Sequence, residues 1–345
     1  MNKKRSLLAV LIVLGLLAAI SGCGIQQKQA ATVSGDEQGK VRMIRDDLGR
    51  EVQIPNQPKR VLALNSSMTE MIFDLGVVPV GKVNEYVIDR PEAKDLPDIS
   101  FENTPNIEII NKLAPDLIIA HAKNHAQILE SLEGTGAAVV CVDPSAAENQ
   151  LIGRVDLIGK ALNRQQEAAA YTKKVEEKSA LLREKIATSP IKTGLFIQGG
   201  NQNITAAQSF CFWGRLLADL GIENIVPLKV SKSSKSGFVT FDIETIIQKD
   251  PDVILILQPG FRSGAGQGKA QGAGQGKAEG AAQGNKNTSP QELLAMYQND
   301  PMWQQLSAVK NGRVFIVPSN VSPGKINALD ALEVTAKLLA PEAFK

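Results

Sequence analysis

The two histidines are the first residues of this sequence that could do chemistry. His121 and His125 are the only histidines in the chain and stand four residues apart. On a helix this spacing can hold a metal ion, but two histidines need further ligands, and no Glu stands beside them as in a zinc protease. His121 directly follows the apolar run 117–120. We therefore expect it to form a polar wall at the mouth of a cleft, with ligation of a metal or of haem iron as the alternative.

Two glutamates occupy matching places in a segment that occurs twice. Glu108 is followed by a Pro-Asp pair at 115–116, and Glu244 is followed at the same spacing by a Pro-Asp pair at 251–252. The two copies are 136 residues apart. Each copy predicts a short helix followed by a buried strand. A Glu in the first turn of a helix favours the helix dipole. Its duplication also indicates a pair of acidic docking points on one face of the protein.

Other polar and aromatic side chains follow apolar runs or lie in adjoining loops. Asn65 and Ser66 come directly after the predicted strand 60–64, and aromatic residues cluster at the start of the predicted helix 210–220. In an α/β lobe, ligands lie at the carboxyl ends of the strands. By position alone, the expected cleft residues are Asn65, Ser66, Tyr86, His121, Phe212, Trp213 and Arg262.

The first residues predict export from the cytoplasm. A basic start, Lys3-Lys4-Arg5, leads into the apolar stretch 7–20, which is shorter than the ~18–20 residues that span a bilayer. The stretch ends in Ile-Ser-Gly-Cys at 20–23 and resembles a bacterial lipobox. That motif implies attachment of a diacylglycerol to the Cys23 thiol and cleavage before it. An uncleaved anchor helix is the alternative.

The order of predicted elements indicates two α/β lobes. Strand, polar loop and helix alternate on both sides of a helical region, within which residues 164–186 contain no Gly or Pro. Such a run predicts about 23 helical residues, roughly 35 Å long, as a rigid connector between lobes. The expected divisions are a signal peptide at 1–22, a tether at 23–41, an N-terminal lobe at 42–145, linking helices at 146–188 and a C-terminal lobe at 189–345.

Local patterns predict further details of the lobes. Ser67 and Glu70 have the spacing of a capping box for the first helix, and residues 199–206 are expected to form a polar loop. An octad repeat at 264–287 has almost no apolar residues and predicts disorder. We expect it to be a neutral surface insertion, with gating of the cleft as the alternative.

Composition excludes several classes of function. With 345 residues the chain favours two domains, and its net charge of +2 gives no general reason to bind nucleic acid. Neither a nucleophile elbow nor a Ser/His/Asp arrangement nor a CxxC pair is present.

Cys141 and Cys211 fall in different predicted lobes and are expected to be buried and unpaired.

Together these segments resemble the substrate-binding proteins of bacterial ABC importers for ferric siderophores, haem and cobalamin. The matching stretches cover nearly all of residues 42–345 apart from the octads, and include both Glu-to-Pro-Asp segments, the lipobox, Asp-Leu-Gly-Arg at 47–50 and Leu-Ser-Ala-Val-Lys-Asn-Gly-Arg-Val at 306–314. The resemblance implies an α/β fold of two Rossmann-like lobes joined by a single long helix, as in class III periplasmic binding proteins. It also implies that Glu108 and Glu244 meet arginines of the permease, one from each lobe.

We therefore expect a monomeric solute-binding protein that is anchored to the membrane outside the cytoplasm, has no cofactor of its own and serves an ABC permease with its ATPase. A ferric siderophore is the first expected cargo, because Arg262 and the neighbouring aromatic residues suit an anionic chelate. Haem or cobalamin comes second, and an anion such as molybdate third. An extracytoplasmic enzyme with a metal at His121 and His125, or a receptor for a sensor protein, are the alternatives from other classes.

Overall fold

The structure is a computed structural model in which residues 40–84, 90–147, 151–199, 204–226, 237–258 and 289–345 are described. Residues 39–345 form one compact unit. The expected cleft residues Tyr86 and Arg262, the octads and the lipobox all lie outside the described residues. Within the described part, no helix is long and apolar enough to cross a membrane.

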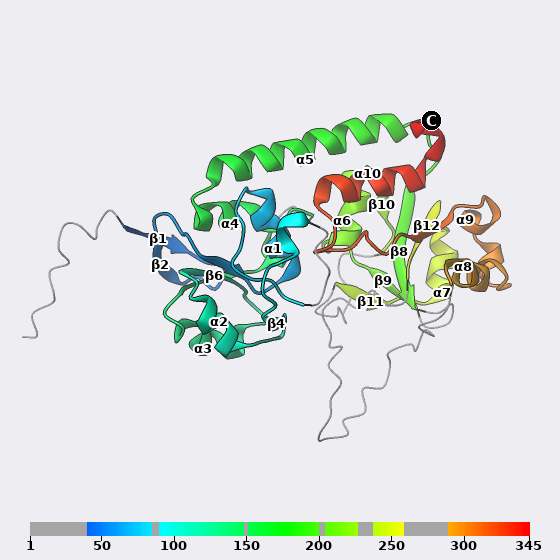
Figure 1. Ribbon diagram of the computed structural model, residues 1–345. Coiled ribbons are helices and arrows are strands. Elements are labelled where there is room, and N and C mark those ends of the chain that lie inside the picture. Colours follow the sequence, from blue (N-terminus) through cyan, green and yellow to red (C-terminus); the bar gives the residue numbers. More distant parts are fainter. Residues whose placement is uncertain (1–39, 85–89, 148–150, 200–203, 227–236, 259–288) are drawn as a thin grey trace, which may run out of the picture. The chain divides into compact units, whose positions relative to one another are not determined.

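The N-terminal half begins with a hairpin and continues as a parallel α/β layer (Figure 1). Antiparallel β1 (Val41–Arg45) and β2 (Glu51–Pro55) form the hairpin. The sheet has the order β3-β6-β7, from β3 (Val61–Ala63), β6 (Leu117–His121) and β7 (Ala138–Val142). The helices and the small β4/β5 hairpin are α1 (Ser66–Asp74), α2 (Ile107–Leu113), α3 (Leu129–Glu133), β4 (Ser100–Phe101) and β5 (Thr104–Pro105).

The C-terminal half contains a mixed six-stranded sheet. Its order is β11-β9-β8-β12-β13, with β10 beside β8. The pairs β8/β12 and β12/β13 are parallel, whereas β9 runs antiparallel to both β8 and β11. The strands are β8 (Thr193–Gly199), β9 (Ile204–Ala207), β10 (Glu223–Asn224), β11 (Phe238–Thr240), β12 (Val253–Leu257) and β13 (Val314–Val317).

The helices of this half are α6 (Phe212–Asp219), α7 (Ile243–Lys249), α8 (Pro290–Gln298), α9 (Ser307–Lys310) and α10 (Ala328–Leu339). Short 3-10 turns complete the chain as η1 (Pro91–Ala93), η2 (Ala126–Ile128), η3 (Pro144–Ala146), η4 (Trp303–Gln305) and η5 (Pro341–Phe344).

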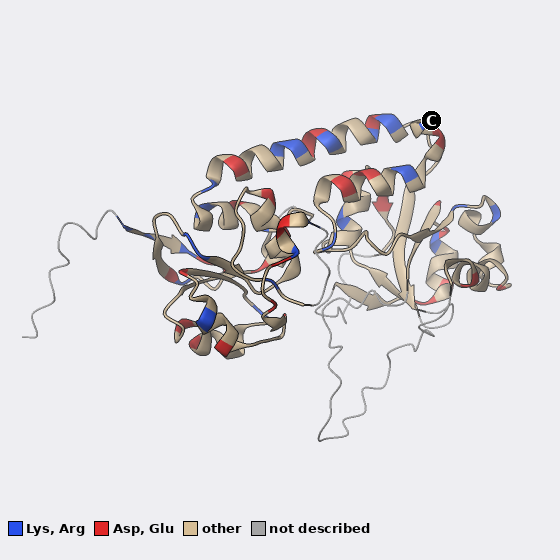
Figure 2. Ribbon diagram, in the orientation of Figure 1, with Lys and Arg blue, Asp and Glu red and all other residues tan. Residues whose placement is uncertain are grey.

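The predicted connector helix is present and packs on both halves. After α4 (Val155–Leu162), the backbone of Asn163 turns into the left-handed region and α5 (Gln165–Ile186) begins. Residues three or four apart form the buried stripe of α5: Ala168, Tyr171, Val175, Ser179, Leu182 and Ile186. Basic and acidic residues alternate along the rest of this helix (Figure 2). One apolar core contains residues of β3, β6 and β7, of α5, and of β8, β12 and α10.

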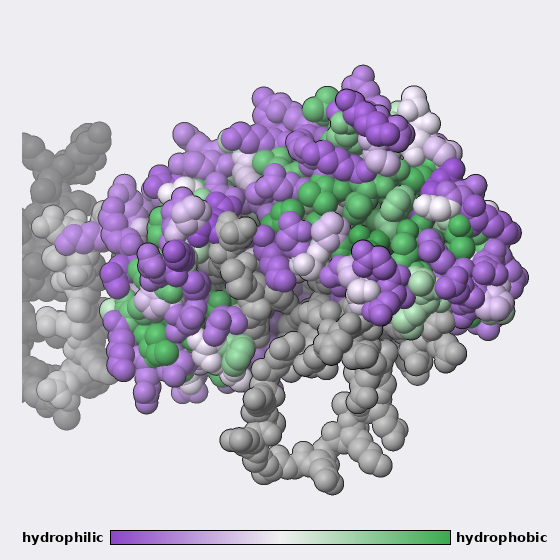
Figure 3. Space-filling view, turned by 45° about the vertical axis from the view of Figure 1, so that its right-hand side comes forward, coloured by the Kyte–Doolittle hydropathy of each residue, from purple (hydrophilic) through white to green (hydrophobic). Residues whose placement is uncertain are grey.

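Two predicted details of the elements are wrong. The first helix has no Ser67–Glu70 capping box, because Asn65 is its N-cap and its side chain accepts from the backbone N–H groups of Ser67 and Met68. The end of the expected polar loop at 199–206 belongs to β9, whose residues Ile204 and Ala206 are buried in the core of the C-terminal half, while residues 200–203 lie outside the described residues. The surface itself is ordinary: hydrophilic residues cover much of the face in Figure 3, with hydrophobic ones between them.

Candidate ligand-binding site

A cavity of about 300 Å³ lies where α1, the ends of β6 and β7, and the segments before α6 and α10 meet. Both halves of the compact unit supply its walls. Asn65 and His121 come from the N-terminal half, Tyr171 from α5, and Phe212 and Asn327 from the C-terminal half. This is the strand-end position at which α/β folds bind ligands. The cavity is therefore the candidate site.

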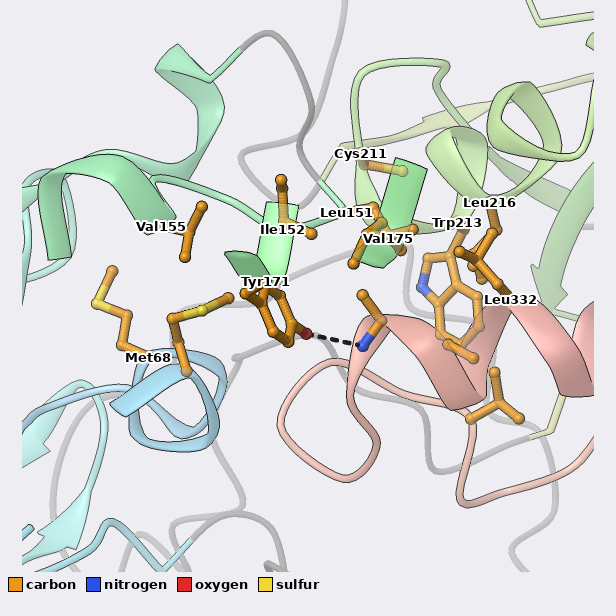
Figure 4. Close-up of a cluster of buried hydrophobic side chains, with 14 of the residues drawn as sticks. Met68, Leu151, Ile152, Val155, Tyr171, Val175, Cys211, Trp213, Leu216 and Leu332 are labelled. Atoms are coloured by element: carbon orange, nitrogen blue, oxygen red, sulfur yellow. Dashed lines mark hydrogen bonds between the residues drawn. The ribbon is translucent and has the colours of Figure 1, made fainter. Parts of the chain in front are cut away.

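Much of the lining is apolar and flexible or aromatic. Met68 and Met71 come from α1, Leu151 and Ile152 from the segment before α4, and Phe210 from the segment before α6. Figure 4 shows Met68, Ile152 and Tyr171 near one another in the apolar cluster that adjoins this wall. Thioether and aromatic side chains adapt to irregular apolar ligands. This wall can hold a molecule that has a hydrophobic face.

The expected pair Asn65 and Ser66 is divided by the structure. Asn65 lines the cavity, whereas Ser66 is buried and donates its hydroxyl and its backbone N–H to Glu102, both at 2.7 Å. The Asn65 amide also donates to Glu102, at 3.0 Å. Ser66 is not among the residues that line the cavity, and the buried carboxylate of Glu102 accepts from both of its donors.

The histidine pair lies at the end of β6 and in the turn that follows, not on a helix. His125 is buried; its Nδ1 accepts the His121 N–H at 2.8 Å, and its Nε2 contacts the Glu102 carbonyl oxygen at 2.6 Å. Since Nδ1 accepts, the proton lies on Nε2 and is donated to that carbonyl. His125 is thus occupied within the fold. The two histidines therefore do not share a helix face, which was the condition under which their spacing could hold a metal ion.

His121 lines the cavity, as predicted from its place after the strand. Its Nδ1 accepts the Lys123 N–H at 3.2 Å, so the neutral ring carries its proton on Nε2 and is a donor there. Burial, together with the nearby His125, lowers the pKa of His121 to about 4. His121 is therefore uncharged at neutral pH. No cluster of three or more potential metal-binding His, Cys, Asp or Glu side chains occurs among the described residues.

A buried ion-pair network borders the cavity beside α1. Arg90 binds Glu70 at 2.7 Å and also pairs with Asp74, and both carboxylates line the cavity. Burial raises the pKa of Glu70 and of Asp74 above the ordinary range, although Arg90 opposes the shift in both. Asp74 also shares a hydrogen bond with the Tyr171 hydroxyl. That hydroxyl accepts the backbone N–H of Ala328 at 3.4 Å, so α5 contacts α1 and the start of α10 at one point (Figure 4).

The aromatic pair of α6 is also divided. Phe212 lines the cavity, but Trp213 does not; its side chain is 5% exposed and packs on the Phe196 ring with centroids 5.3 Å apart. In Figure 4 it lies beside Leu216 and Leu332. Neighbouring residues on a helix point about 100° apart. For this reason one of the two faces the cavity while the other is in the core, and the expected cleft contact of Trp213 is not observed.

Sequence reasoning missed most of the α1 wall. Four residues of this helix line the cavity: Met68, Glu70, Met71 and Asp74. In the sequence their pattern indicates only an ordinary amphipathic helix. The available signal was the pair of acidic residues four apart on a helix that follows a strand end. The partner Arg90 is sixteen residues beyond Asp74, and nothing in the sequence spacing indicates that contact.

The duplicated glutamates stand in matching surroundings. Glu108 and Glu244 are exposed in the first turns of α2 and α7, behind the capping side chains of Asn106 and Asp242. Asn106 accepts the Ile109 N–H at 3.1 Å and Asp242 the Thr245 N–H at 2.7 Å. Both helices end on a residue with φ of 42°. The two acidic positions are therefore built in the same way in both halves.

The two cysteines of the described part of the chain, Cys141 and Cys211, are free and buried, as predicted. Cys141 lies in β7 and is part of an apolar core. Cys211 precedes α6 and lines the cavity. Burial raises the pKa of the Cys141 thiol to about 11. Burial also raises the pKa of the Cys211 thiol. Neither thiol is a nucleophile at neutral pH.

Comparison with known proteins shows which proteins this chain is similar to. The profile of a family described as periplasmic binding protein matches residues 61–321. An Fe(3+)-citrate-binding protein of Bacillus subtilis is 25% identical over 323 residues, covering 91% of this chain and 89% of its own. A putative ABC transporter substrate-binding lipoprotein of the same organism is 26% identical over 330 residues, covering 92% and 91%.

Solved structures have the same fold. The Staphylococcus aureus protein SirA, complexed with staphyloferrin B, aligns with a TM-score of 0.62 at 21% identity, covering 88% of this chain and 98% of that one. The alignment extends over both halves and the helix between them, which is the two-lobed arrangement predicted from the sequence.

Proposed function

Because the chain belongs to the periplasmic binding protein family, we propose that it captures a ferric chelate in the cavity between its halves and delivers it to an ABC importer. The chain is a solute-binding protein of such importers and not an enzyme. The observation that carries the proposal is the cavity itself, which lies at the strand ends and is walled by both halves. Iron is the cargo in this proposal, and the protein acts as a monomer without a cofactor of its own.

The proposed cargo class rests on chemistry and on relatives. One relative is named for Fe(3+)-citrate, and one structural neighbour was solved with staphyloferrin B. The apolar wall around Met68, Met71 and Phe212 accommodates the organic frame of a chelate. Neutral His121 offers an N–H donor for an oxygen of the chelate. Such a site holds an iron complex without replacing its ligands.

The proposed docking surface consists of Glu108 and Glu244. Both are exposed at equivalent helix starts, and neither has an ion-pair partner among the described residues. Exposed carboxylates of this kind steer a basic partner and fix its register, and they add little affinity. We propose that one arginine of the permease meets each of them.

The double variant Glu108→Lys with Glu244→Lys tests the docking role. Uptake of iron-55 from the supplied chelate should fall to the background level of cells that lack the protein, because like charges then face each other at both contacts. The affinity of the purified variant for the same chelate should stay within about twofold of the wild type.

A matched control reverses two exposed glutamates outside α2 and α7. Glu51 and Glu342 are exposed in β2 and in the last turn. Their change to Lys alters net charge equally and should leave uptake intact. Normal uptake by the Glu108/Glu244 variant, or equal loss in the control, would remove these two residues from the docking surface.

We further propose that Cys23 carries the lipid anchor that holds the protein outside the cytoplasm. A relative is named as a lipoprotein, and residues 20–23 have the lipobox pattern. Cys23→Ala should abolish labelling by radioactive palmitate and release the protein from the membrane fraction. Continued labelling of the variant would contradict the assignment.

A further inference from the structure

The two basic side chains that line the described part of the cavity are both already paired. Lys123 binds Asp143 at 2.9 Å, and Arg154 binds Asp47 at 3.1 Å and Asp156 at 3.2 Å. Arg154 and Asp47 are largely buried. An anionic ligand would have to compete with these carboxylates for each cation. The described wall therefore offers no vacant cation to a negatively charged chelate.

The carboxyl groups outnumber the cations at the wall formed by α1. Glu70 and Asp74 line the cavity with side chains 8% and 11% exposed, and they share the single guanidinium of Arg90. Two carboxyl groups thus share one cation at this place, which leaves no positive charge for a ligand. A negative charge brought by a ligand into this poorly solvated space would be repelled by an ionised carboxylate more strongly than in water.

The N-terminus of α1, where an anion would ordinarily bind, is occupied by the protein itself. The Glu102 carboxylate accepts the Ser66 N–H at 2.7 Å. Asn65 Oδ1 accepts the N–H groups of Ser67 and Met68, at 3.0 and 3.2 Å. A full carboxylate and an amide oxygen thus fill the helix end that faces the cavity.

The N-terminus of α10 is filled in the same way. Asn327 accepts the Asp330 N–H at 3.0 Å, and the Ala328 N–H is donated to Tyr171. At the third helix beside the cavity, α6, the backbone N–H groups of Trp213 and Gly214 bond to the buried Cys211 sulfur. This helix start is therefore also occupied by the protein itself.

From these contacts we infer that the cavity selects a ferric chelate without net negative charge, neutral or singly cationic, with an apolar frame. The inference rests on the proposed function and narrows its cargo. It departs from the anionic chelate expected from Arg262, a residue outside the described part of the chain. A polycarboxylate complex would lose its hydration against Met68, Met71, Phe210 and Phe212 without gaining a free cation among the described residues.

A matched series of chelates tests the inference. Ferrioxamine B is a ferric trihydroxamate with one free amine and a charge of +1; its N-acetyl derivative is neutral, and its N-succinyl derivative carries −1. The full-length protein in detergent would be titrated with each, and with ferric citrate, by tryptophan fluorescence at neutral pH. The cationic and neutral compounds should bind with similar affinity, and the N-succinyl compound about tenfold more weakly.

Two variants at one ion pair separate charge from shape. Asp143→Asn leaves Lys123 without its carboxylate partner. The ratio of the affinities for the neutral and the anionic compound should therefore fall by about fivefold. Lys123→Met should raise this ratio. Glu51→Gln, at an exposed residue outside the cavity, is the control and should leave the ratio unchanged.

Each outcome decides the inference. Equal or tighter binding of the N-succinyl compound or of ferric citrate would overturn the charge selection and leave the proposed function standing. Binding of none of these ferric chelates would overturn both. A third outcome is that Asp143→Asn still binds the neutral compound and leaves the affinity ratio of the neutral and anionic compounds unchanged. That result would show that the preference for the neutral compound does not arise from these charges, and it would overturn the inference as well.

Discussion

At the scale of single residues, Phe212 and Trp213 show how neighbouring side chains take different roles. Phe212 lines the cavity, and Trp213 packs beneath it, with the two rings edge to face and their centroids 5.2 Å apart. A bound ferric chelate would lie against the first ring. It would not contact the Trp213 ring and would affect it only by quenching its fluorescence.

Trp213→Phe should therefore keep the affinity for the chelate within about threefold of the wild type, since a smaller aromatic ring still fills most of the core site. Phe212→Ala should weaken binding about tenfold or more, because it removes apolar contact from the ligand itself. Isothermal titration calorimetry measures both without relying on tryptophan. A larger loss in Trp213→Phe than in Phe212→Ala would place the ligand elsewhere.

His121 makes stability depend on pH. Its pKa is lowered to about 4 in the folded chain, against roughly 6.5 when unfolded. Between these values the unfolded state binds more protons, so stability is lost as pH falls from about 6.5 towards 4. From pH 7.5 to pH 5 this amounts to about 2 kcal/mol.

His121→Gln removes that contribution. Urea unfolding of the variant at pH 7.5 and at pH 5 should show a loss of stability smaller than that of the wild type by about 2 kcal/mol. The same loss in both proteins would mean that His121 titrates normally in the folded state.

At the scale of elements, the duplicated Pro-Asp pair has a structural reason. Asp116 accepts the backbone N–H groups of Lys59 and Arg60, at 2.7 and 3.0 Å, beside the start of β3. Asp252 accepts those of Lys192 and Thr193, at 2.8 and 2.9 Å, beside the start of β8. Burial alone would raise the pKa of Asp252, but these hydrogen bonds outweigh it and lower the pKa. Each Asp joins the beginnings of two parallel strands.

Asp116→Ala and Asp252→Ala should each lower the free energy of unfolding by about 1–2 kcal/mol, because two backbone donors lose a charged acceptor. Chemical denaturation measures the loss. Asp95→Ala, at an exposed residue outside both strands, is the control and should change stability by less than about 0.5 kcal/mol. Losses no larger than the control's would leave the repeat without this explanation.

The repeat, the connector helix and most strands were predictable because each depends on neighbours in sequence. The buried runs of β6 and β12 are continuous, and α5 contains no Gly or Pro. The capping box was wrongly predicted because the helix begins two residues earlier, with Asn65 as its N-cap, so that Ser67 lies inside the first turn. The strand β9 was missed because its short sequence, Ile-Thr-Ala-Ala, is a strand through its pairing with β8 and β11.

The site was predictable only in part for the same reason. Asn65, His121 and Phe212 follow strand ends or begin a helix, so their position along the chain indicated the cavity. The partners that set its charge come from distant segments: Arg90 reaches α1, and Glu102 reaches Ser66. Such contacts depend on how loops return to the sheet, which local pattern does not encode.

At the scale of the whole molecule, the two halves are joined by a shared core and by the contacts of α5. Lys178 of α5 pairs with Glu333 of α10, and Tyr171 lies between α1 and α10. Closely packed cores resist large rearrangement. We therefore expect ligand capture to proceed with limited closure of the halves, consistent with a cavity that is already formed by both of them.

The most direct test of the central claim is equilibrium binding of the purified full-length protein to ferric siderophores, haem, cobalamin and molybdate, each followed by calorimetry. We predict one-to-one, saturable binding of a ferric siderophore that is weakened by Phe212→Ala. Saturable binding of haem, cobalamin or molybdate in its place would contradict the proposed cargo. No binding of any of the four would contradict the claim that this cavity captures a solute of these classes.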